Sequence, residues 1–212
     1  MPGEEWTTTE HALRYLALAD DYPHRAEGEA ALLEQVPGDA RRVLDLGTGG
    51  GRLLGLLSRH RPGIRGVGLD FSEPMLRAAR ERFDDDPRVE LVEHDLSEPL
   101  PGEALGSFDV VVSSFAIHHL EHERKRSLYG EVFGLLEPGG VFANLEHVAS
   151  PSRRAHEAFF AAIGEPLEEE DPSDRLLGVE PQLGWLRGFG FEDVDCYWKW
   201  CEMALLVGLK PA

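Results

Sequence analysis

The chain has 212 residues, and its 39 Asp and Glu residues against 21 Lys and Arg leave a formal net charge of −18 at pH 7. This length is enough for one domain built around a single hydrophobic core. The negative charge repels phosphate backbones and anionic lipid, so we expect neither nucleic acid nor a membrane as partner. The sequence also lacks the run of about 20 apolar residues that crossing a bilayer requires.

The N-terminus and the cysteines indicate the cellular compartment. The first residues, MPGEEWTTTE, lack the apolar stretch of a signal peptide. The two cysteines, Cys196 and Cys201, do not have the CxxC spacing of a redox or metal motif. The sequence therefore predicts a cytoplasmic protein with free thiols.

From residue 43 onwards, short apolar runs alternate with longer amphipathic runs. The apolar runs predict strands at 43–46, 65–69, 88–93, 108–113, 141–147, 191–198 and 202–209. The amphipathic runs predict helices near 50–59, 73–82, 122–136, 153–162 and 181–188, with one or two more inside 7–36. Ser72 is expected to cap the second of these helices, and Pro138-Gly139-Gly140 to end the helix at 122–136.

Strand–helix alternation with buried strands is typical of a parallel sheet covered by helices on both faces. The last two strands are separated by too few residues for a crossover helix, so they must form an antiparallel hairpin. We therefore predict an α/β fold: a Rossmann-like doubly wound sheet of seven strands, mostly parallel, with a C-terminal antiparallel hairpin. We expect one domain over 1–212, with a helical cap at 1–40, a ligand-binding core at 41–147, a helical insertion at 148–190 and the hairpin at 191–212.

A glycine-rich turn follows the first predicted strand in the stretch VLDLGTGGGRLLGLL, residues 43–57. A phosphate-binding loop of the GxxxxGK[ST] type needs a lysine and a hydroxyl, but Arg52 and Leu53 follow these glycines, which excludes a nucleoside triphosphatase. The dinucleotide pattern GxGxxG would need its third glycine at position 52, which is Arg52. The turn lets the backbone lie against a ligand but leaves no room for pyrophosphate.

Acidic residues end the next two predicted strands. Asp70 follows the second strand, where an acid can accept hydrogen bonds from both hydroxyls of a ribose. Asp95, in His94-Asp95-Leu96, follows the third strand and is placed to accept a hydrogen bond from an adenine amino group. Because open α/β sheets bind ligands at the carboxyl ends of their strands, these features predict a nucleoside without pyrophosphate.

The stretches VLDLGTGGG, GLDFS, HDL, FDVVVSSFAIHHL and LLEPGGVF resemble, in order, the motifs of class I S-adenosylmethionine-dependent methyltransferases. The resemblance covers residues 43–147, and GFEDVDCYWKWCEMALLVGLK resembles the terminal hairpin of that family. The small-molecule members known as methyltransferase types 11 and 12 are the groups it resembles. The resemblance implies S-adenosyl-L-methionine as cofactor and S-adenosyl-L-homocysteine as product. It also implies that the turn at Gly47, Thr48 and Gly49 supports the methionine part, that Asp70 holds the ribose and that Asp95 reads the adenine.

Five further residues complete the expected cofactor site. Phe71 flanks the adenine ring, with a core position as its alternative, and Leu96 and Ser113 are counted among the cofactor contacts. Arg25, the only Lys or Arg between Arg14 and Arg41, is the candidate partner of the cofactor carboxylate. Asp45 lies inside an apolar strand, where an unpaired carboxylate is costly. We expect it to accept hydrogen bonds from backbone amides of its own glycine loop, with a cofactor ammonium contact as a further role.

Histidines and one glutamate gather at the ends of the fourth and fifth predicted strands, where the methyl acceptor should bind. In one interpretation His118 or His119 is a general base oriented by Glu146, because the usual pKa of histidine suits that task. In a second, His118, His119, Glu146 and His147 are metal ligands, although their spacing does not match an HExxH helix and we expect no metal. In a third, one histidine packs in the core and the other lies in solvent. Tyr22, His147 and His156 are the candidate substrate contacts.

The sequence thus predicts an enzyme, a methyltransferase that moves a methyl group to an O, N or S nucleophile of a small molecule, as a monomer or homodimer. The first alternative is an enzyme acting on the cofactor itself, because the helical N-terminus and the hairpin also look similar to the carboxy-S-adenosylmethionine synthase group. That group needs an added basic residue for a carboxylated product, and none can be placed in this sequence. The second alternative is a non-catalytic S-adenosylmethionine-binding protein.

Overall fold

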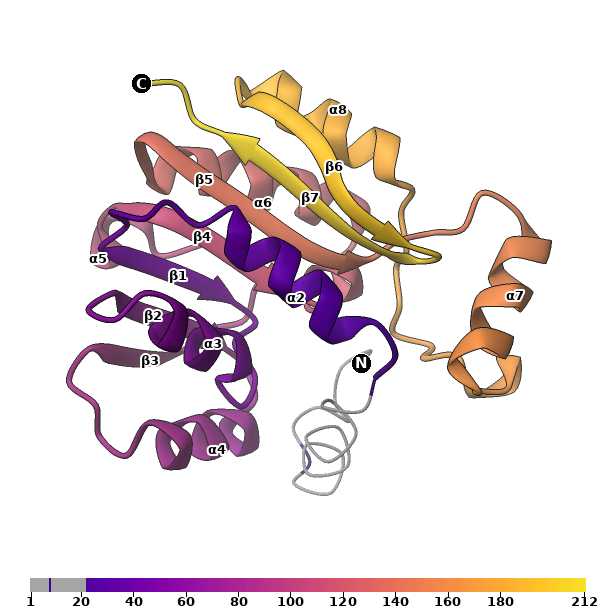
Figure 1. Ribbon diagram of the computed structural model, residues 1–212, viewed down its shortest axis with the longest axis horizontal. Coiled ribbons are helices and arrows are strands. Elements are labelled where there is room, and N and C mark those ends of the chain that lie inside the picture. The colour runs from indigo at the N-terminus through magenta and orange to yellow at the C-terminus, as the bar shows by residue number, and fades with distance from the viewer. Residues whose placement is uncertain (1–7, 9–21) are drawn as a thin grey trace.

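The computed structural model describes residue 8 and residues 22–212, which form a sheet with helices on both faces (Figure 1). The strand order is β3-β2-β1-β4-β5-β7-β6. The first five strands pair in parallel, and β7 pairs antiparallel with both β5 and β6. The seven strands are β1 (Arg42–Leu46), β2 (Arg65–Asp70), β3 (Val89–Glu93), β4 (Phe108–Ser114), β5 (Leu136–His147), β6 (Glu192–Trp200) and β7 (Met203–Leu209). The predicted fold class, including the terminal hairpin, is confirmed.

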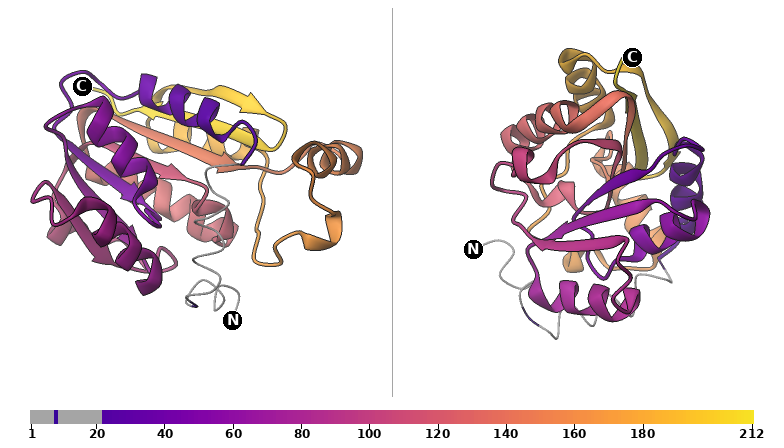
Figure 2. Two further views of the ribbon diagram at one scale, coloured as in Figure 1. Left: turned by 60° about the horizontal axis from the view of Figure 1, so that its bottom comes forward. Right: turned by 90° about the vertical axis from the view of Figure 1, so that its left-hand side faces the viewer.

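Helices α6 (His122–Leu135) and α8 (Val179–Phe189) contact each other and cover one face of the sheet, whereas α2 (Arg25–Glu34) and α3 (Arg52–His60) cover the other (Figure 2). The remaining helices are α4 (Glu73–Phe83), α5 (Gly102–Leu105), α7 (Arg153–Ile163), η2 (Ile117–His119) and η3 (Leu167–Glu169). Among the described residues, no helix is long and apolar enough to cross a membrane.

Side chains of the central strands alternate between two cores, one on each face of the sheet. In β1, Val43 packs in the core under α2 and α3, and its neighbour Leu44 packs in the core under α6 and α8. This is the period-two alternation of a strand buried on both faces. Helix α2 lies very close to the sheet: a Cβ on Gly28 would stand 2.8 Å from Leu145 Cδ1 and 2.9 Å from Trp198 Cζ3.

The predicted element boundaries hold to within a few residues, with one exception. Helix α6 ends at Leu135 and β5 begins at Leu136, so Pro138-Gly139-Gly140 lies inside the strand and does not end the helix. Ser72 caps α4 as predicted, since its Oγ accepts a hydrogen bond from the Met75 amide. Helix α2 lies in the stretch 7–36 predicted to be helical, and most of that stretch before it is outside the described residues. Cys196 and Cys201 are free thiols.

Candidate active site

The glycine turn after β1 depends on glycine for both its backbone conformation and its packing. Gly47, Gly49 and Gly51 have φ angles of 72°, 52° and 73°, in the left-handed region that favours glycine. A Cβ on Gly47 would stand 2.2 Å from the Ala116 Cβ. The turn is thus pressed against the segment that follows β4, which carries the histidines.

Asp70, at the end of β2, holds the turn in place. Its Oδ2 accepts a hydrogen bond from the Gly49 amide at 2.8 Å, and its Oδ1 accepts one from the Ser72 amide at 2.9 Å. The carboxylate is 9% exposed, and burial raises its pKa while these amide hydrogen bonds oppose the rise. Since a carboxylate oxygen can accept more than one hydrogen bond, both oxygens can still accept from hydroxyl groups of a ligand.

The sequence-based expectation for Asp45 was wrong in its partner. Its Oδ2 accepts a hydrogen bond from the Thr48 hydroxyl at 2.7 Å, and a loop amide, that of Gly49, bonds to Asp70 instead. The other oxygen, Oδ1, is buried and makes no hydrogen bond within the described part of the chain. Burial, and to a smaller extent the charge of Asp70, raise the pKa of Asp45 to about 7. A buried carboxylate with an unsatisfied oxygen next to the turn is a ready partner for a cation.

The ends of β2 and β3 lie side by side, because the His94 amide donates to the Asp70 carbonyl at 2.9 Å. Phe71 is 38% exposed, so it does not belong to either core. Asp95 is exposed and accepts a hydrogen bond from the Ser97 amide at 2.8 Å, whereas Leu96 is buried. These residues offer one aromatic ring, one carboxylate and one apolar side chain beside Asp70.

Ser113, expected among the cofactor contacts, is fully buried. Its hydroxyl donates to the Leu46 carbonyl at 2.8 Å and ties β4 to β1 just before the glycine turn. The structure therefore gives this side chain a positioning role.

Arg25 on α2 is buried and paired. Its Nε donates to Glu29 Oε1 at 3.0 Å, and its guanidinium lies 5.2 Å from the ring centroid of Phe115. Arg52, the residue that stands at the third glycine position, donates two hydrogen bonds of 2.8 Å to the same Glu29 carboxylate. Two guanidinium groups therefore converge on one carboxylate at the N-terminus of α3, directly after the glycine turn.

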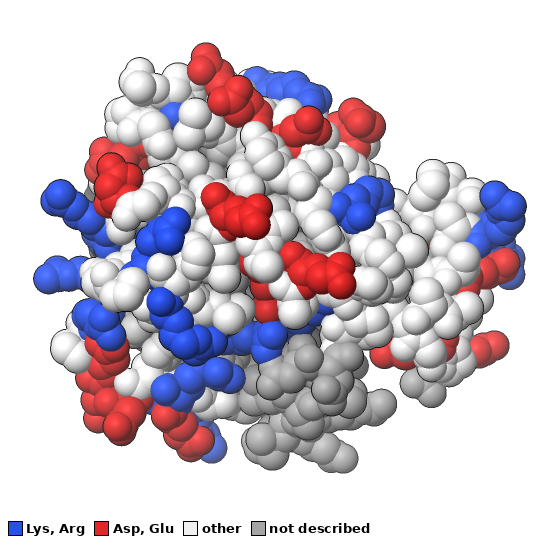
Figure 3. All heavy atoms as spheres, viewed as in Figure 1, with Lys and Arg blue, Asp and Glu red and all other residues white. Residues whose placement is uncertain are grey.

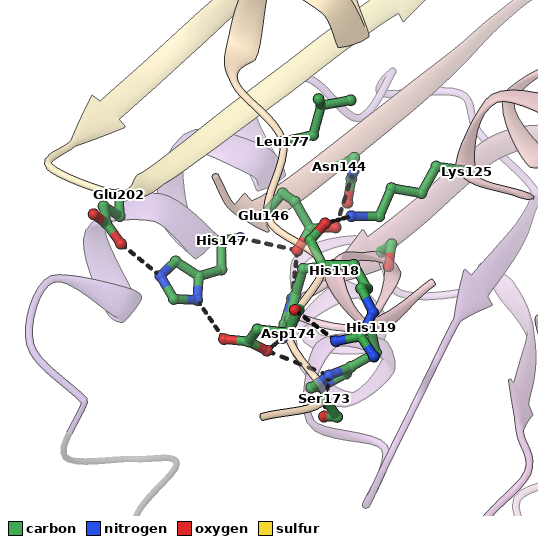
Figure 4. A network of polar contacts seen from close by, with 12 residues as sticks. His118, His119, Lys125, Asn144, Glu146, His147, Ser173, Asp174, Leu177 and Glu202 are labelled. Atoms are coloured by element: carbon green, nitrogen blue, oxygen red, sulfur yellow. Dashed lines mark hydrogen bonds and ion pairs between the residues drawn. The ribbon is translucent and has the colours of Figure 1, made fainter. Parts of the chain in front are cut away.

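The predicted histidines converge with Glu146 at the ends of β4 and β5 (Figure 4). His118 and His119 lie on η2, which follows β4, while Glu146 and His147 end the neighbouring strand β5. His118 Nδ1 lies 2.6 Å from Glu146 Oε1, and both side chains are at most 8% exposed. The predicted pairing of His118 with Glu146 is therefore present in the structure.

Sequence reasoning missed two acids of this cluster. Asp174, from the loop before α8, lies between three imidazoles. Its Oδ1 is 3.5 Å from His118 Nε2 and 3.4 Å from His119 Nδ1. Its Oδ2 is 3.4 Å from His147 Nδ1. Glu202, fully buried in the turn between β6 and β7, lies 3.0 Å from His147 Nε2 and 2.9 Å from His156 Nδ1. In the sequence, Asp174 ends a proline-bounded acidic stretch, EPLEEEDPSD at 165–174, whereas no pattern singles out Glu202.

The charges of the cluster shift its pKa values in opposite directions. Burial would raise the pKa of Glu146, but the His118 and Lys125 charges and hydrogen bonds from His118 and the His147 amide hold it below its ordinary value. Burial would lower the pKa of His147, but Asp174 and Glu202 raise it to about 9. Burial and the charge of His118 lower the pKa of His119 to about 4.

Tyr22 and His156, two of the candidate substrate contacts, lie on separate elements near the cluster. The Tyr22 ring centroid lies 6.4 Å from that of Phe115, on the segment after β4. His156 lies on α7 and joins the cluster through Glu202. Tyr22, Phe115 and Trp200 are partly buried around a small apolar core formed by Phe159, Phe160 and Met203.

A mostly parallel sheet in this strand order, with a glycine turn after β1 and acids after β2 and β3, defines a Rossmann-like ligand-binding fold. Residues 43–140 match the family model described as a methyltransferase domain. The family model covers just under half of the chain, and together with the relatives and solved structure described below it supports a class I S-adenosylmethionine-dependent methyltransferase.

Two curated relatives and one solved structure illustrate the similarity. The chain is 34% identical over 140 residues to a demethylmenaquinone methyltransferase of Thermus thermophilus, covering 65% of this chain and 60% of that protein. It is 40% identical over 164 residues to a trans-aconitate 2-methyltransferase of Paracidovorax citrulli, covering 75% of this chain and 52% of that protein. The chain thus spans less than two thirds of these relatives. It also shares its fold with Haemonchus contortus phosphoethanolamine N-methyltransferase 2, solved in complex with S-adenosyl-L-methionine. The TM-score is 0.73 and the identity 17%, and the match covers 99% of this chain and 59% of that one.

Proposed function

We propose that the chain transfers a methyl group from S-adenosyl-L-methionine to an O, N or S nucleophile of a small molecule. The observation that carries this proposal is that two carboxylates fix the glycine turn. The Gly49 amide donates a hydrogen bond to Asp70, and the Thr48 hydroxyl donates one to Asp45. This arrangement presents backbone and acids to a nucleoside that carries a cationic side chain. The match of residues 43–140 to a methyltransferase domain supports the same cofactor.

The charges around the turn suit each end of the cofactor. The ribose hydroxyls would bond to Asp70, and the adenine would lie between Phe71, Asp95 and Leu96 at the ends of β2 and β3. The methionine ammonium would approach the unsatisfied Oδ1 of Asp45. The methionine carboxylate would lie at the N-terminus of α3, beside Arg25 and Arg52, where the helix dipole favours an anion.

Methyl transfer from a sulfonium is an in-line displacement, so alignment contributes most, and a base is needed only for an acceptor that must lose a proton. The geometry distinguishes the two candidate bases. His118 is held by Glu146 and its side chain is 8% exposed, whereas the His119 side chain is 25% exposed. Its pKa is lowered to about 4, so the His119 imidazole is neutral at pH 7, and it is the ring of the pair that an acceptor can reach. We therefore assign the base to His119 and a positioning role to His118 and Glu146.

The acceptor class follows from the charge of the cluster. The buried carboxylates of Glu146, Asp174 and Glu202 disfavour an acceptor that brings further negative charge. A small hydroxyl, thiol or amine compound fits better, with Tyr22, His147 and His156 on its side of the site. The relatives named for trans-aconitate and demethylmenaquinone extend well beyond the matched region, so their acceptors are starting points for a screen.

A screen of small hydroxyl, thiol, amine and carboxylate compounds, scored by release of S-adenosyl-L-homocysteine, tests this proposal. We expect turnover with at least one neutral acceptor, and the loss of turnover in the Asp70→Ala variant. Incubation with prephenate and mass analysis of the cofactor covers the carboxy-S-adenosylmethionine synthase alternative. Cofactor binding without turnover of any acceptor would instead favour the non-catalytic binding protein.

A further inference from the structure

We propose that His118, His147 and Asp174 form a binding site for one divalent transition-metal ion. One ligand atom from each residue lies within 4.8 Å of those of the other two. The ring nitrogens beside Asp174 are His118 Nε2 and His147 Nδ1. Glu146, which the sequence placed in the ligand set, is instead an outer partner of His118. Metal binding here does not depend on the methyltransferase function.

The distances around Asp174 differ from those of hydrogen bonds. Its oxygens lie 3.5 Å from His118 Nε2 and 3.4 Å from His147 Nδ1, longer than the roughly 2.7–3.2 Å of a good N–H···O bond. Ligands that lie about 2.0–2.2 Å from one tetrahedral ion are separated by roughly 3.3–3.5 Å. The side chain of Asp174 is 9% exposed, yet its Oδ1 has no hydrogen bond within the described residues. The spacing and the unsatisfied oxygen both fit a shared cation.

Two further carboxylates, those of Glu146 and Glu202, hold the imidazoles beside Asp174 (Figure 4). Glu146 Oε1 lies 2.6 Å from His118 Nδ1, and Glu202 Oε2 lies 3.0 Å from His147 Nε2. In the neutral form of each ring, which is the form that binds a metal ion, the carboxylate accepts the N–H and the lone pair of the opposite ring nitrogen faces Asp174, so metal binding would release the second proton of His147. Metal-binding histidines characteristically donate their second ring N–H to a carboxylate in this way. Both histidines here have such a partner, and each partner comes from the end of a strand or from a hairpin turn.

The charge of the cluster is compatible with a bound cation. Glu146, Asp174 and Glu202 are three carboxylates with side chains at most 9% exposed, grouped around His118 and His147. Buried carboxylates are costly unless they are paired or bound to a metal. The buried ammonium of Lys125 donates to the Arg175 carbonyl at the edge of this cluster. A divalent ion between His118, His147 and Asp174 would balance charge at the centre.

Two imidazoles and one carboxylate are the ligand set that suits zinc or ferrous iron. Three protein ligands leave a coordination position open, as in catalytic metal sites. His119 lies beside the same carboxylate, since its Nδ1 is 3.4 Å from Asp174 Oδ1 and 2.9 Å from Ser173 Oγ. If the proposed function holds, an acceptor oxygen bound at the open position would lose its proton more easily, and His119 is placed to receive it.

The test uses the full chain after dialysis against a chelator, without cofactor or acceptor. We expect Zn²⁺ titrated by calorimetry to bind one ion per chain, and Co²⁺ to give a visible absorption band of low-symmetry coordination. Asp174→Asn and His147→Gln should each weaken Zn²⁺ binding more than 100-fold, and Glu202→Gln should weaken it about 10- to 100-fold. His60→Gln, on the exposed end of α3, is the matched control and should bind as the parent does.

Thermal unfolding gives a second measurement if one variant folds poorly. Zn²⁺ should raise the Tm of the parent and of His60→Gln, and should leave the Tm of His147→Gln or Asp174→Asn unchanged. Absence of Zn²⁺ and Co²⁺ binding by the parent would overturn the site, as would equal binding by the parent and both ligand variants. S-adenosyl-L-methionine binding, measured separately, reports on the proposed function and can succeed or fail independently of the metal.

Discussion

His118 Nδ1 lies 2.6 Å from Glu146 Oε1, with both groups buried, while the neighbouring His119 faces Ser173 and Asp174. Adjacent residues of one short helix therefore have different surroundings. His118 belongs to a fixed carboxylate–imidazole pair, and His119 is the more exposed ring.

This difference predicts different effects of replacing the two histidines. With an acceptor that must lose a proton, His119→Gln should lower turnover about 10²- to 10⁴-fold, the usual cost of removing a general base. The affinity for S-adenosyl-L-methionine should stay within about threefold of the parent, because the glycine turn is untouched. Steady-state kinetics and calorimetry measure the two quantities. Turnover of His119→Gln within threefold of the parent, together with a large loss in His118→Gln, would move the base to His118.

A second prediction concerns the close approach at Gly47. Alanine at this position would place its Cβ 2.2 Å from the Ala116 Cβ and would have to adopt a φ of 72°. The left-handed conformation costs about 1–2 kcal/mol and overpacking about 1–3 kcal/mol, so Gly47→Ala should lose roughly 2–5 kcal/mol of unfolding free energy. Urea denaturation measures it. Gly38→Ala is the control because a Cβ there meets nothing within 4 Å. Equal stability of the two variants would contradict the packing described for the turn.

A third prediction concerns the pH dependence that Asp45 introduces. Burial raises its pKa from 3.8 to about 7, so the folded state holds this proton more tightly than the unfolded state does. The contribution of Asp45 to stability therefore falls as pH rises from about 4 to about 7, by up to about 4 kcal/mol, and is constant above that range. Relative to the parent, Asp45→Asn should become more stable across this range. A Tm difference between the two proteins that does not change from pH 4.5 to pH 8 would refute the raised pKa.

A fourth prediction follows from the net charge. With −18 at pH 7, the chain should not bind tRNA or DNA measurably at physiological salt. Lys and Arg side chains do appear around α3, which carries Arg52 and Arg59, beside acidic ones on the face shown in Figure 3. A gel-shift experiment in the low micromolar range is therefore a real test. A shifted complex that Arg59→Glu abolishes would overturn the prediction and make a nucleic acid the methyl acceptor to examine.

The elements and most of the cluster could be predicted from the sequence because each follows from a local pattern. Apolar runs of regular length mark the strands, and His118, His119, Glu146 and His147 directly follow or end two neighbouring strands. Parallel pairing of β4 with β5 then brings them together.

The residues that sequence reasoning missed reach the site from distant elements. Asp174 comes from an irregular loop and Glu202 from a hairpin turn, where no periodicity indicates the direction of a side chain. The sequence predicts that Asp45 accepts hydrogen bonds from amides of its own glycine loop, because this acid and the loop are close in sequence. One of those amides is that of Gly49. Instead Asp70 accepts that hydrogen bond from the end of the next strand, and pairing of β1 with β2 makes it the nearer acid in space.

Calorimetric titration of the parent and of Asp70→Ala with S-adenosyl-L-methionine tests the central claim most directly. We expect the parent to bind one cofactor per chain and Asp70→Ala to bind it with an affinity about 10- to 1,000-fold lower. The variant loses charge-assisted hydrogen bonds of roughly 1.5–3 kcal/mol each, and water compensates for part of this loss. Asp86→Ala, which removes a partly exposed acid paired with Arg88, should bind as the parent does. A parent that binds no S-adenosyl-L-methionine, or an Asp70→Ala variant that binds it as tightly as the parent, would contradict the account.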